Sequence, residues 1–165
     1  MNTGQKPKIN KVLFSDLDGT LIQTLSGNDF PIACYDMQPR FDTLAAIKLF
    51  KPDIVCIITN QGGIEKGFVN RLFFENKCHW VSSIIAEGCR TDCVYDYCDT
   101  TDINNIKRKP NPGMIDRFKK HFNKYFSDNC TFLMIGDRPE DETCAKNANV
   151  PYLNVEDFIK EYKPE

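Results

Sequence analysis

The sequence has no long apolar run and almost no excess of charge of either sign. Of its 165 residues, 41% are hydrophobic and 27% are charged, and the formal net charge is -2. A charge so close to zero provides no overall positive field that would attract nucleic acid or anionic lipid. The polar residues 1–11 are followed by no apolar stretch that could form a signal peptide or a membrane span. We therefore expect a soluble, cytoplasmic protein without a membrane partner.

The sequence also lacks internal repeats, low-complexity tracts and linker-like segments. Its length is typical of one compact domain, so we expect a single domain over residues 1–165. The phosphate-binding pattern G-x-x-x-x-G-K-[ST] is absent from the sequence. A kinase activity of that type is therefore not expected in this chain.

Eight cysteines are present, but they lack the paired C-x2-C spacing of compact zinc sites. Without a secretory signal, we expect them to remain thiols. The candidate zinc ligands that lie close together in the sequence are Cys78, His79, Cys89, Cys93 and Cys98. Zinc at these residues is less favoured than unligated thiols in a loop-rich segment.

Short apolar segments alternate along the chain with longer segments of helical periodicity. Strands are predicted at residues 12–15, 54–58, 94–97, 131–135 and 151–153. Helices are predicted between and after them, at residues 39–51, 69–87, 112–126, 140–148 and 155–162. This alternation predicts an α/β fold of three layers, Rossmann-like, in which a mostly parallel central sheet carries helices on both faces.

The unusual polar residues of the sequence gather where the predicted strands end. They are Asp16 and Asp18 after the first strand, Thr59 and Asn60 after the second, Lys109 before a helix, and Asp137 and Asp141 after the fourth strand. Ligands of open α/β sheets bind at the carboxyl ends of the strands, so we expect these residues to meet in space. Each group alone could be an ordinary turn or a helix cap. Their common placement is what favours a functional site.

Several carboxylates in one site need a cation to offset their charge. Asp16, Asp18 and Asp137 therefore predict a hard metal ion with oxygen ligands, and Mg2+ fits best because it binds through few carboxylates and leaves positions for water and phosphate oxygens. Lys109 and the hydroxyl of Thr59 can donate hydrogen bonds to a phosphate group. The sequence thus indicates a phosphate site built around a metal.

Asp16 and Asp18 are two residues apart in an extended segment, so both side chains point to one side and can face one ligand. One carboxylate can attack phosphorus while the other protonates the leaving oxygen and later activates water. Gly19 lets the backbone turn sharply after them. The spacing therefore suits hydrolysis of a phosphate monoester.

Together these residues resemble the haloacid dehalogenase superfamily of phosphatases over about residues 12–158. The motifs that carry the resemblance are FSDLDGTL at 14–21, ITNQ at 58–61, RKP at 108–110 and IGDRPED at 135–141. Aspartate at position 18 favours a phosphatase over the dehalogenase branch of the superfamily.

The resemblance implies a role for each matching residue. Asp16 is implied as the nucleophile that forms an aspartyl-phosphate and Asp18 as the general acid/base. Thr59 and Lys109 are implied to hold the phosphoryl group, and Asp137 to complete the Mg2+ site. The remaining candidates are Asp141 as outer support of the metal or of Lys109, and Asn60, Arg108 and Gly19 as phosphate or substrate contacts.

The substrate is left open by the sequence. Segments 59–64 and 108–114 resemble the subgroup that contains histidinol phosphatases, heptose bisphosphate phosphatases and polynucleotide 3'-phosphatases. We place a small phosphorylated metabolite, such as a sugar phosphate, slightly ahead of a nucleic-acid end, which the basic residues 107–109 would help to dock. A phosphotransferase with the same residues and a catalytically inactive phosphate-binding module are further candidates.

The segment after the first motif is too short for a folded cap domain. Only about twenty residues separate Thr20 from the helix predicted at Pro39. We therefore expect a rather open site without a large cap. Residues 29–37 are the candidate flap and residues 89–105 the candidate wall that select the substrate.

Overall fold

The computed structural model describes residues 9–31, 33–126 and 129–163. Its centre is a five-stranded sheet with the order β5-β4-β1-β6-β7, in which every neighbouring pair is parallel. The strands are β1 (Lys11–Ser15), β4 (Ile54–Asn60), β5 (Asp92–Cys98), β6 (Thr131–Gly136) and β7 (Tyr152–Asn154). The first strand in the sequence thus lies in the middle of the sheet, flanked by β4 and β6.

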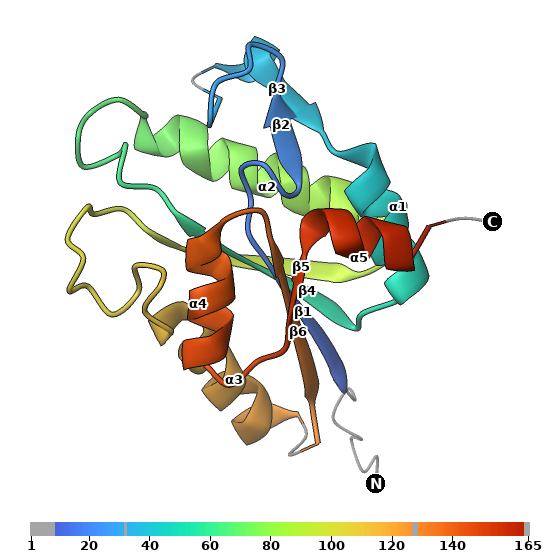
Figure 1. Cartoon of the computed structure of the whole chain (residues 1–165). Helices are drawn as coiled ribbons and strands as arrows, with labels where there is room; N and C mark the ends of the chain where they lie inside the picture. Colours follow the sequence, from blue (N-terminus) through green and yellow to red (C-terminus); the bar gives the residue numbers. More distant parts are fainter. Residues whose placement is uncertain (1–8, 32, 127–128, 164–165) are drawn as a thin grey trace, which may run out of the picture.

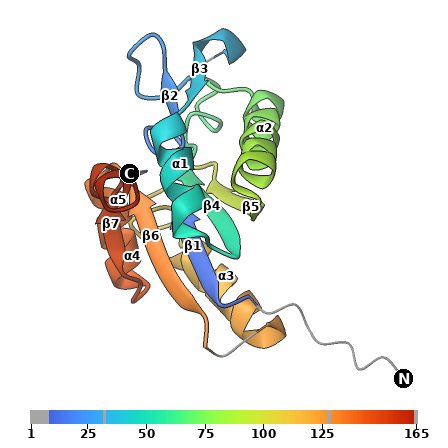
Figure 2. The ribbon, with the colours of Figure 1, turned by 90° about the vertical axis from the view of Figure 1, so that its right-hand side faces the viewer.

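Helices cover both faces of this sheet (Figures 1 and 2). They are α1 (Phe41–Phe50), α2 (Arg71–Cys89), α3 (Gly113–Tyr125), α4 (Pro139–Asn147) and α5 (Val155–Glu161). Buried residues of α1, α2 and α5 form the core on one face, and buried residues of α3 and α4 form the core on the other. This confirms the predicted three-layer α/β fold. Across the described residues, none of the helices combines the length and apolarity needed to span a bilayer.

Strand β1 shows why the fold follows from its sequence. Leu13 points into the core shared with α1, α2 and α5, whereas Val12 and Phe14 point into the core shared with α3 and α4. All three side chains have an exposed fraction of 0%. A continuous apolar run is typical of a parallel strand that is buried on both faces. Its burial fixes the position of the polar residues that follow it.

A small antiparallel hairpin stands beyond the carboxyl ends of the sheet strands (Figure 1). It pairs β2 (Ile22–Thr24) with β3 (Met37–Pro39), and the short 3-10 helix η1 (Cys34–Asp36) precedes β3. Among the described residues between Thr20 and Arg40, no other helix or strand is present. This short hairpin agrees with the prediction that the segment is too small to form a large cap domain. Ile32, which falls inside the predicted flap, lies outside the described residues.

The predicted helix start at Pro39 is wrong by two residues. Pro39 pairs with Ile22 in the hairpin, and α1 begins at Phe41. The backbone N–H of Arg40 donates to the carbonyl of Leu21 at 2.9 Å, which keeps the chain extended up to this point. The Arg40 guanidinium also donates to the carbonyl of Gly19 at 2.9 Å and to Glu156 at 2.8 Å. Arg40 thereby joins three parts of the chain, namely the base of the hairpin, the turn that follows β1, and helix α5.

No disulfide joins the described cysteines, and their burial differs widely. Burial raises the pKa of Cys78, Cys93 and Cys144 to about 12 in each case. The segment that holds residues 78–98 is mostly regular structure, α2 and β5, so the expectation that it is rich in loops is wrong. Cys34, on the hairpin, is exposed. Since the thiolate is the reactive form, the exposure of Cys34 favours reaction there, and the raised pKa values disfavour reaction at the three buried or partly buried thiols.

Ile85 and Leu72 lie on the same helix, α2, but have exposed fractions of 0% and 66%. We predict that Ile85→Ala lowers the free energy of unfolding by about 2–5 kcal/mol, because it removes buried methyl groups and leaves a cavity. Leu72→Ala should change it by less than about 0.5 kcal/mol. Urea unfolding of the two variants measures both values, and equal losses would contradict the assigned orientation of α2.

A thiol reagent at about pH 8 should label Cys34 before any other described cysteine. The variant Cys34→Ser should then lose the fast phase of labelling, followed by the absorbance of the released chromophore. A fast phase that persists in Cys34→Ser, with label found on Cys78 or Cys144, would show that the α2 or α4 interface opens more readily than the structure indicates.

Candidate active site

Asp16 follows the last residue of β1 and is held at the carboxyl end of the sheet. Its backbone N–H donates to the carbonyl of Ile135 on β6 at 3.1 Å. Its exposed fraction is 6%, so the carboxylate is nearly removed from bulk water. The carboxylate nevertheless lines a cavity, and one of its oxygens contacts the ammonium group of Lys109.

The ammonium of Lys109 lies between two carboxylates. Its Nζ is 2.5 Å from Asp16 Oδ1 and 2.6 Å from Asp141 Oδ1, and the lysine is 4% exposed. Burial alone would lower the pKa of Lys109, but the charges of Asp16 and Asp141 outweigh it and raise this pKa. Lys109 is therefore a permanently charged donor at the centre of the site.

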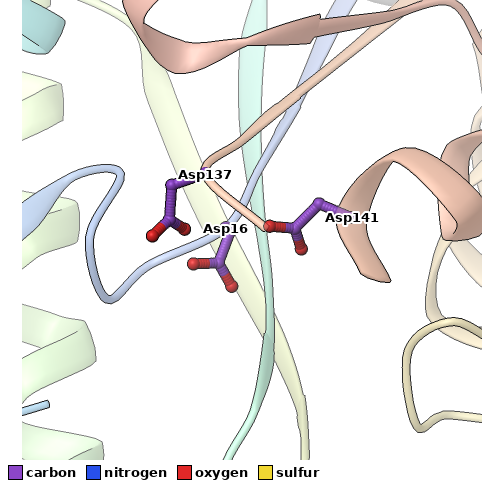
Figure 3. A group of neighbouring side chains, drawn as sticks. All are labelled: Asp16, Asp137 and Asp141. Carbon is purple, nitrogen blue, oxygen red and sulfur yellow. The ribbon is translucent and has the colours of Figure 1, made fainter. Parts of the chain in front are cut away.

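Three carboxylates converge on this point from two parts of the chain (Figure 3). Asp16 follows β1, Asp137 follows β6, and Asp141 lies in the first turn of α4. One oxygen from each lies within 4.8 Å of the other two. Among the described residues this is the group of side chains close enough to share one metal ion, and no cysteine belongs to it.

Two glycines make the approach of these carboxylates possible. Gly19 has a φ of +88°, and a Cβ atom on it would overlap with the Asp137 carboxylate. A Cβ atom on Gly136 would overlap with the Asp141 carboxylate in the same way. Gly19 was predicted as a phosphate or substrate contact, and that role stays a prediction. The structure gives it a steric role, because only glycine leaves room there for Asp137.

The charge balance of the group fits a divalent cation. The pKa of Asp16 is raised to about 7, first by burial and also by the charge of the Asp141 carboxylate, and the charge of Lys109 opposes this rise. Partial burial and Asp141 also raise the pKa of Asp137. These carboxylates are thus destabilised as anions, and a hard cation with oxygen ligands would relieve this. The donor set suits Mg2+ or a similar ion.

Asp18 lies apart from the three converging carboxylates. Its Oδ2 accepts a hydrogen bond from Gln61 Nε2 at 2.8 Å, and its Oδ1 lies 3.0 Å from the ammonium of Lys77 on α2. Its predicted part in metal binding stays a prediction. Its placement beside the cavity, two residues after Asp16, is compatible with the role of an acid or base.

The second and third motifs are joined through Asn60. Its side-chain amide donates to the carbonyl of Lys109 and accepts from the N–H of Lys109, both at 2.9 Å. Asn60 therefore fixes the loop that carries Lys109. Thr59 is 2% exposed, and its hydroxyl accepts from Gln61 at 2.9 Å. Arg108 borders the cavity and donates to the carbonyl of Thr100 at 2.8 Å.

The cavity at this site has a volume of about 360 Å³. All the predicted catalytic side chains line it: Asp16, Asp18, Thr59 and Lys109. Its outer lining includes Asp29 and Phe30 from the candidate flap, Thr101 from the candidate wall, and Lys66 and Phe68. Phe30 and Phe68 are 39% and 70% exposed. The site is thus bordered by aromatic and charged side chains.

Gln61 and Lys77 contact the site but were not predicted as functional residues. Gln61 lies within a motif, but its two hydrogen-bond partners come from different segments. Lys77 lies on the apolar face of α2 and meets Asp18 over a separation of 59 residues. The sequence does contain one signal for the role of Lys77, because it is a lysine within an otherwise apolar stripe of the predicted helix.

We predict that Asp137→Asn lowers the affinity for Mg2+ by at least about tenfold, because it removes the charge of one of the three converging carboxylates. Calorimetric titration with Mg2+ alone measures this affinity, and the Mg2+-dependent rise in Tm should shrink in parallel. Asp116→Asn, an exposed acidic position in the first turn of α3, is the matched control and should bind Mg2+ as the unmodified protein does. Equal affinity in both variants would place the ion elsewhere.

Comparison with known proteins identifies relatives over most of the chain. Residues 11–158 match the family described as polynucleotide kinase 3 phosphatase. A D-glycero-alpha-D-manno-heptose-1,7-bisphosphate 7-phosphatase of Burkholderia mallei is 30% identical over 150 residues, covering 86% of this chain and 77% of the relative. A D-glycero-beta-D-manno-heptose-1,7-bisphosphate 7-phosphatase of Pasteurella multocida is also 30% identical, covering 86% and 79%.

Solved structures share the fold. The D,D-heptose 1,7-bisphosphate phosphatase of B. bronchiseptica, complexed with magnesium and phosphate, has a TM-score of 0.70 and 23% identity, covering 86% of this chain and 78% of its own. A HAD-like phosphatase of Mesorhizobium loti has a TM-score of 0.66 and 24% identity, covering 91% and 74%. With its sheet order, its motifs at the strand ends and these matches, the chain belongs to the polynucleotide kinase 3 phosphatase family and to the haloacid dehalogenase superfamily of phosphatases.

Proposed function

We propose that this phosphatase hydrolyses phosphate monoesters with the help of Mg2+ and through an aspartyl-phosphate on Asp16. The observation that carries the proposal is the setting of Asp16. Its carboxylate is nearly buried, yet it lines an open cavity, beside the ammonium of Lys109 and the carboxylates of Asp137 and Asp141. A nucleophile, a donor for phosphate oxygens and a cation site are thus within reach of one phosphoryl group.

The reaction has two steps. In the first, a carboxylate oxygen of Asp16 forms a bond to phosphorus, the bond from phosphorus to the leaving oxygen breaks, and Asp18, which enters this step as the carboxylic acid, gives that oxygen its proton and becomes a carboxylate. In the second, Asp18 takes a proton from water as the water oxygen bonds to phosphorus. The bond between Asp16 and phosphorus then breaks and releases inorganic phosphate.

The other residues hold the phosphoryl group during both steps. Lys109 Nζ and Thr59 Oγ1 donate to the phosphoryl oxygens, and Asp141 and Asn60 hold Lys109 in position. Asp16 and Asp137, supported by Asp141, would hold Mg2+. The ion supplies positive charge that reduces the repulsion between carboxylate and phosphate.

We propose a small phosphorylated metabolite, such as a sugar phosphate, as the substrate. Two relatives at 30% identity are heptose bisphosphate phosphatases, which supports this class. The cavity of about 360 Å³ is near the lower end of the size range of small-molecule sites. Polar side chains in its outer lining, such as Asp29, Glu140 and Arg138, can bind the hydroxyl groups of a sugar.

A nucleic-acid end is the second candidate, favoured by the outer lining of the same cavity. Phe30 and Phe68 are exposed there and can stack on bases, while Lys66 and Arg108 can meet phosphate groups. The description of the matching family points the same way. The near-neutral charge of the chain opposes it, because non-specific affinity for nucleic acid depends on many basic contacts.

The test is Mg2+-dependent phosphate release from sugar phosphates, histidinol phosphate, nucleotides and 3'-phosphorylated oligonucleotides. We predict turnover that falls by at least about a thousandfold in Asp16→Asn, because the nucleophile is lost. Asp116→Asn is again the matched control and should keep full turnover. The best substrate decides between metabolite and nucleic-acid end, and Phe68→Ala should weaken only the latter by loss of stacking.

Two results would contradict the proposal. Phosphate transfer to an added alcohol in preference to water would make the chain a phosphotransferase. The absence of release from every substrate, in folded protein with Mg2+ bound, would favour a phosphate-binding module.

A further inference from the structure

We propose that Lys77 of α2 is a positioning residue for the phosphatase reaction, which holds the carboxylate of Asp18 in its working orientation together with Gln61. The inference rests on the proposed function, in which Asp18 is the acid and base. It assigns a role to a residue outside all four motifs.

Lys77 is buried where an apolar residue would be expected. Its side chain is 1% exposed, and its neighbours Phe74, Cys78 and Val81 form the buried stripe of α2. Its ammonium lies 5.4 Å from the centre of the Phe74 ring. Burying an ammonium costs several kcal/mol unless a counter-charge accepts it. The partner that the structure gives Lys77 is Asp18.

The two groups are in contact through both carboxylate oxygens. Lys77 Nζ lies 3.0 Å from Asp18 Oδ1 and 3.3 Å from Oδ2. Gln61 Nε2 adds a third contact to Oδ2 at 2.8 Å. A carboxylate bound at both oxygens by donors from two different elements has little freedom to rotate about its own bonds. Asp18 is thus held by α2 and by the loop after β4.

The same amide nitrogen of Gln61 also contacts Thr59 Oγ1, at 2.9 Å. Hydrogen bonds therefore connect four side chains beside the cavity: Lys77, Asp18, Gln61 and Thr59. A long helical side chain leans toward the amino end of its own helix, which allows Lys77 to reach Asp18 from α2. The set links the proposed acid and base to a proposed phosphate-binding residue.

Packing alone does not account for a lysine at this position. A methionine has similar length and flexibility, favours helices equally and would fill the same space without a buried charge. Replacing a buried ion pair by apolar residues is often neutral or stabilising. A charged residue here is explained by its action on Asp18. It orients the carboxyl group, and it stabilises the carboxylate that remains once the leaving oxygen has taken the proton.

This role predicts a dependence on the leaving group. An alkyl phosphate needs a proton on its leaving oxygen, whereas 4-nitrophenyl phosphate releases a stable anion without one. In Lys77→Met, formation of the phosphorylated protein in the first turnover should fall by about 10- to 100-fold with an alkyl phosphate, since a misplaced group costs about that much. With 4-nitrophenyl phosphate it should fall by less than about threefold, and KM should stay unchanged for both. Rapid-quench kinetics measures these rates.

A double-mutant cycle separates positioning from a general structural effect. If Lys77 acts through Asp18, Lys77→Met should cause no further loss in an Asp18→Asn background. Lys77→Gln, whose amide can still donate to Asp18, should recover part of the rate. Lys119→Met is the matched control, because Lys119 on α3 is also partly buried and donates instead to the carbonyl of Ala148 at 2.7 Å. It should leave the rates unchanged.

Equal losses with both substrates, an unchanged rate, or a full additional loss in the Asp18→Asn background would each overturn the proposal. Should Lys77→Met fail to fold, as judged by its melting curve, Lys77→Gln takes its place, with a smaller loss expected that is again confined to the alkyl phosphate. Loss of turnover in Asp16→Asn tests the proposed function separately. Turnover that depends on Asp16 with no selective effect at Lys77 would therefore reject this inference and leave the function standing.

Discussion

The buried contact between Asp16 and Lys109 is the constraint on which the rest of the site depends. A carboxylate this far removed from water is costly, and its nearest compensation is an ammonium that is itself buried. Lys109 in turn needs Asp141, and its loop is fixed by the side chain of Asn60. Asp16 thus needs the charge of Lys109, and Lys109 needs the charge of Asp141 and the hydrogen bonds of Asn60. This dependence explains why residues from four strand and helix ends meet at one place.

The fold supplies the rigidity that this arrangement needs. Strands β1, β4 and β6 are buried in the middle of the sheet, so the residues that follow them have little freedom. The close packing at Gly19 and Gly136 brings the two remaining carboxylates within range of Asp16. The hairpin and the loops contribute the exposed outer lining, such as Phe30 and Phe68, and are the natural place for substrate selection.

The sequence predicted the elements whose signals are local and continuous. The apolar runs of β1, β4 and β6, and the polar residues at their ends, identified the sheet and the position of the site. The hairpin was missed because its strands, Ile22–Thr24 and Met37–Pro39, are too short to show an alternation. Lys77 and the pairing of Asn60 with Lys109 depend on contacts between distant segments, which no local pattern reveals. The burial that raises the pKa of Asp16 likewise appears only in the folded chain.

The most direct test of the proposed mechanism is to locate the phosphoryl group during turnover. Protein mixed with a labelled phosphate monoester and Mg2+ is quenched in acid within the first turnover, digested and analysed by mass spectrometry. We expect phosphate on the peptide that contains Asp16, and its loss in Asp16→Asn. Phosphate on another residue, or phosphate release with no labelled peptide under conditions that preserve acyl phosphates, would contradict the mechanism.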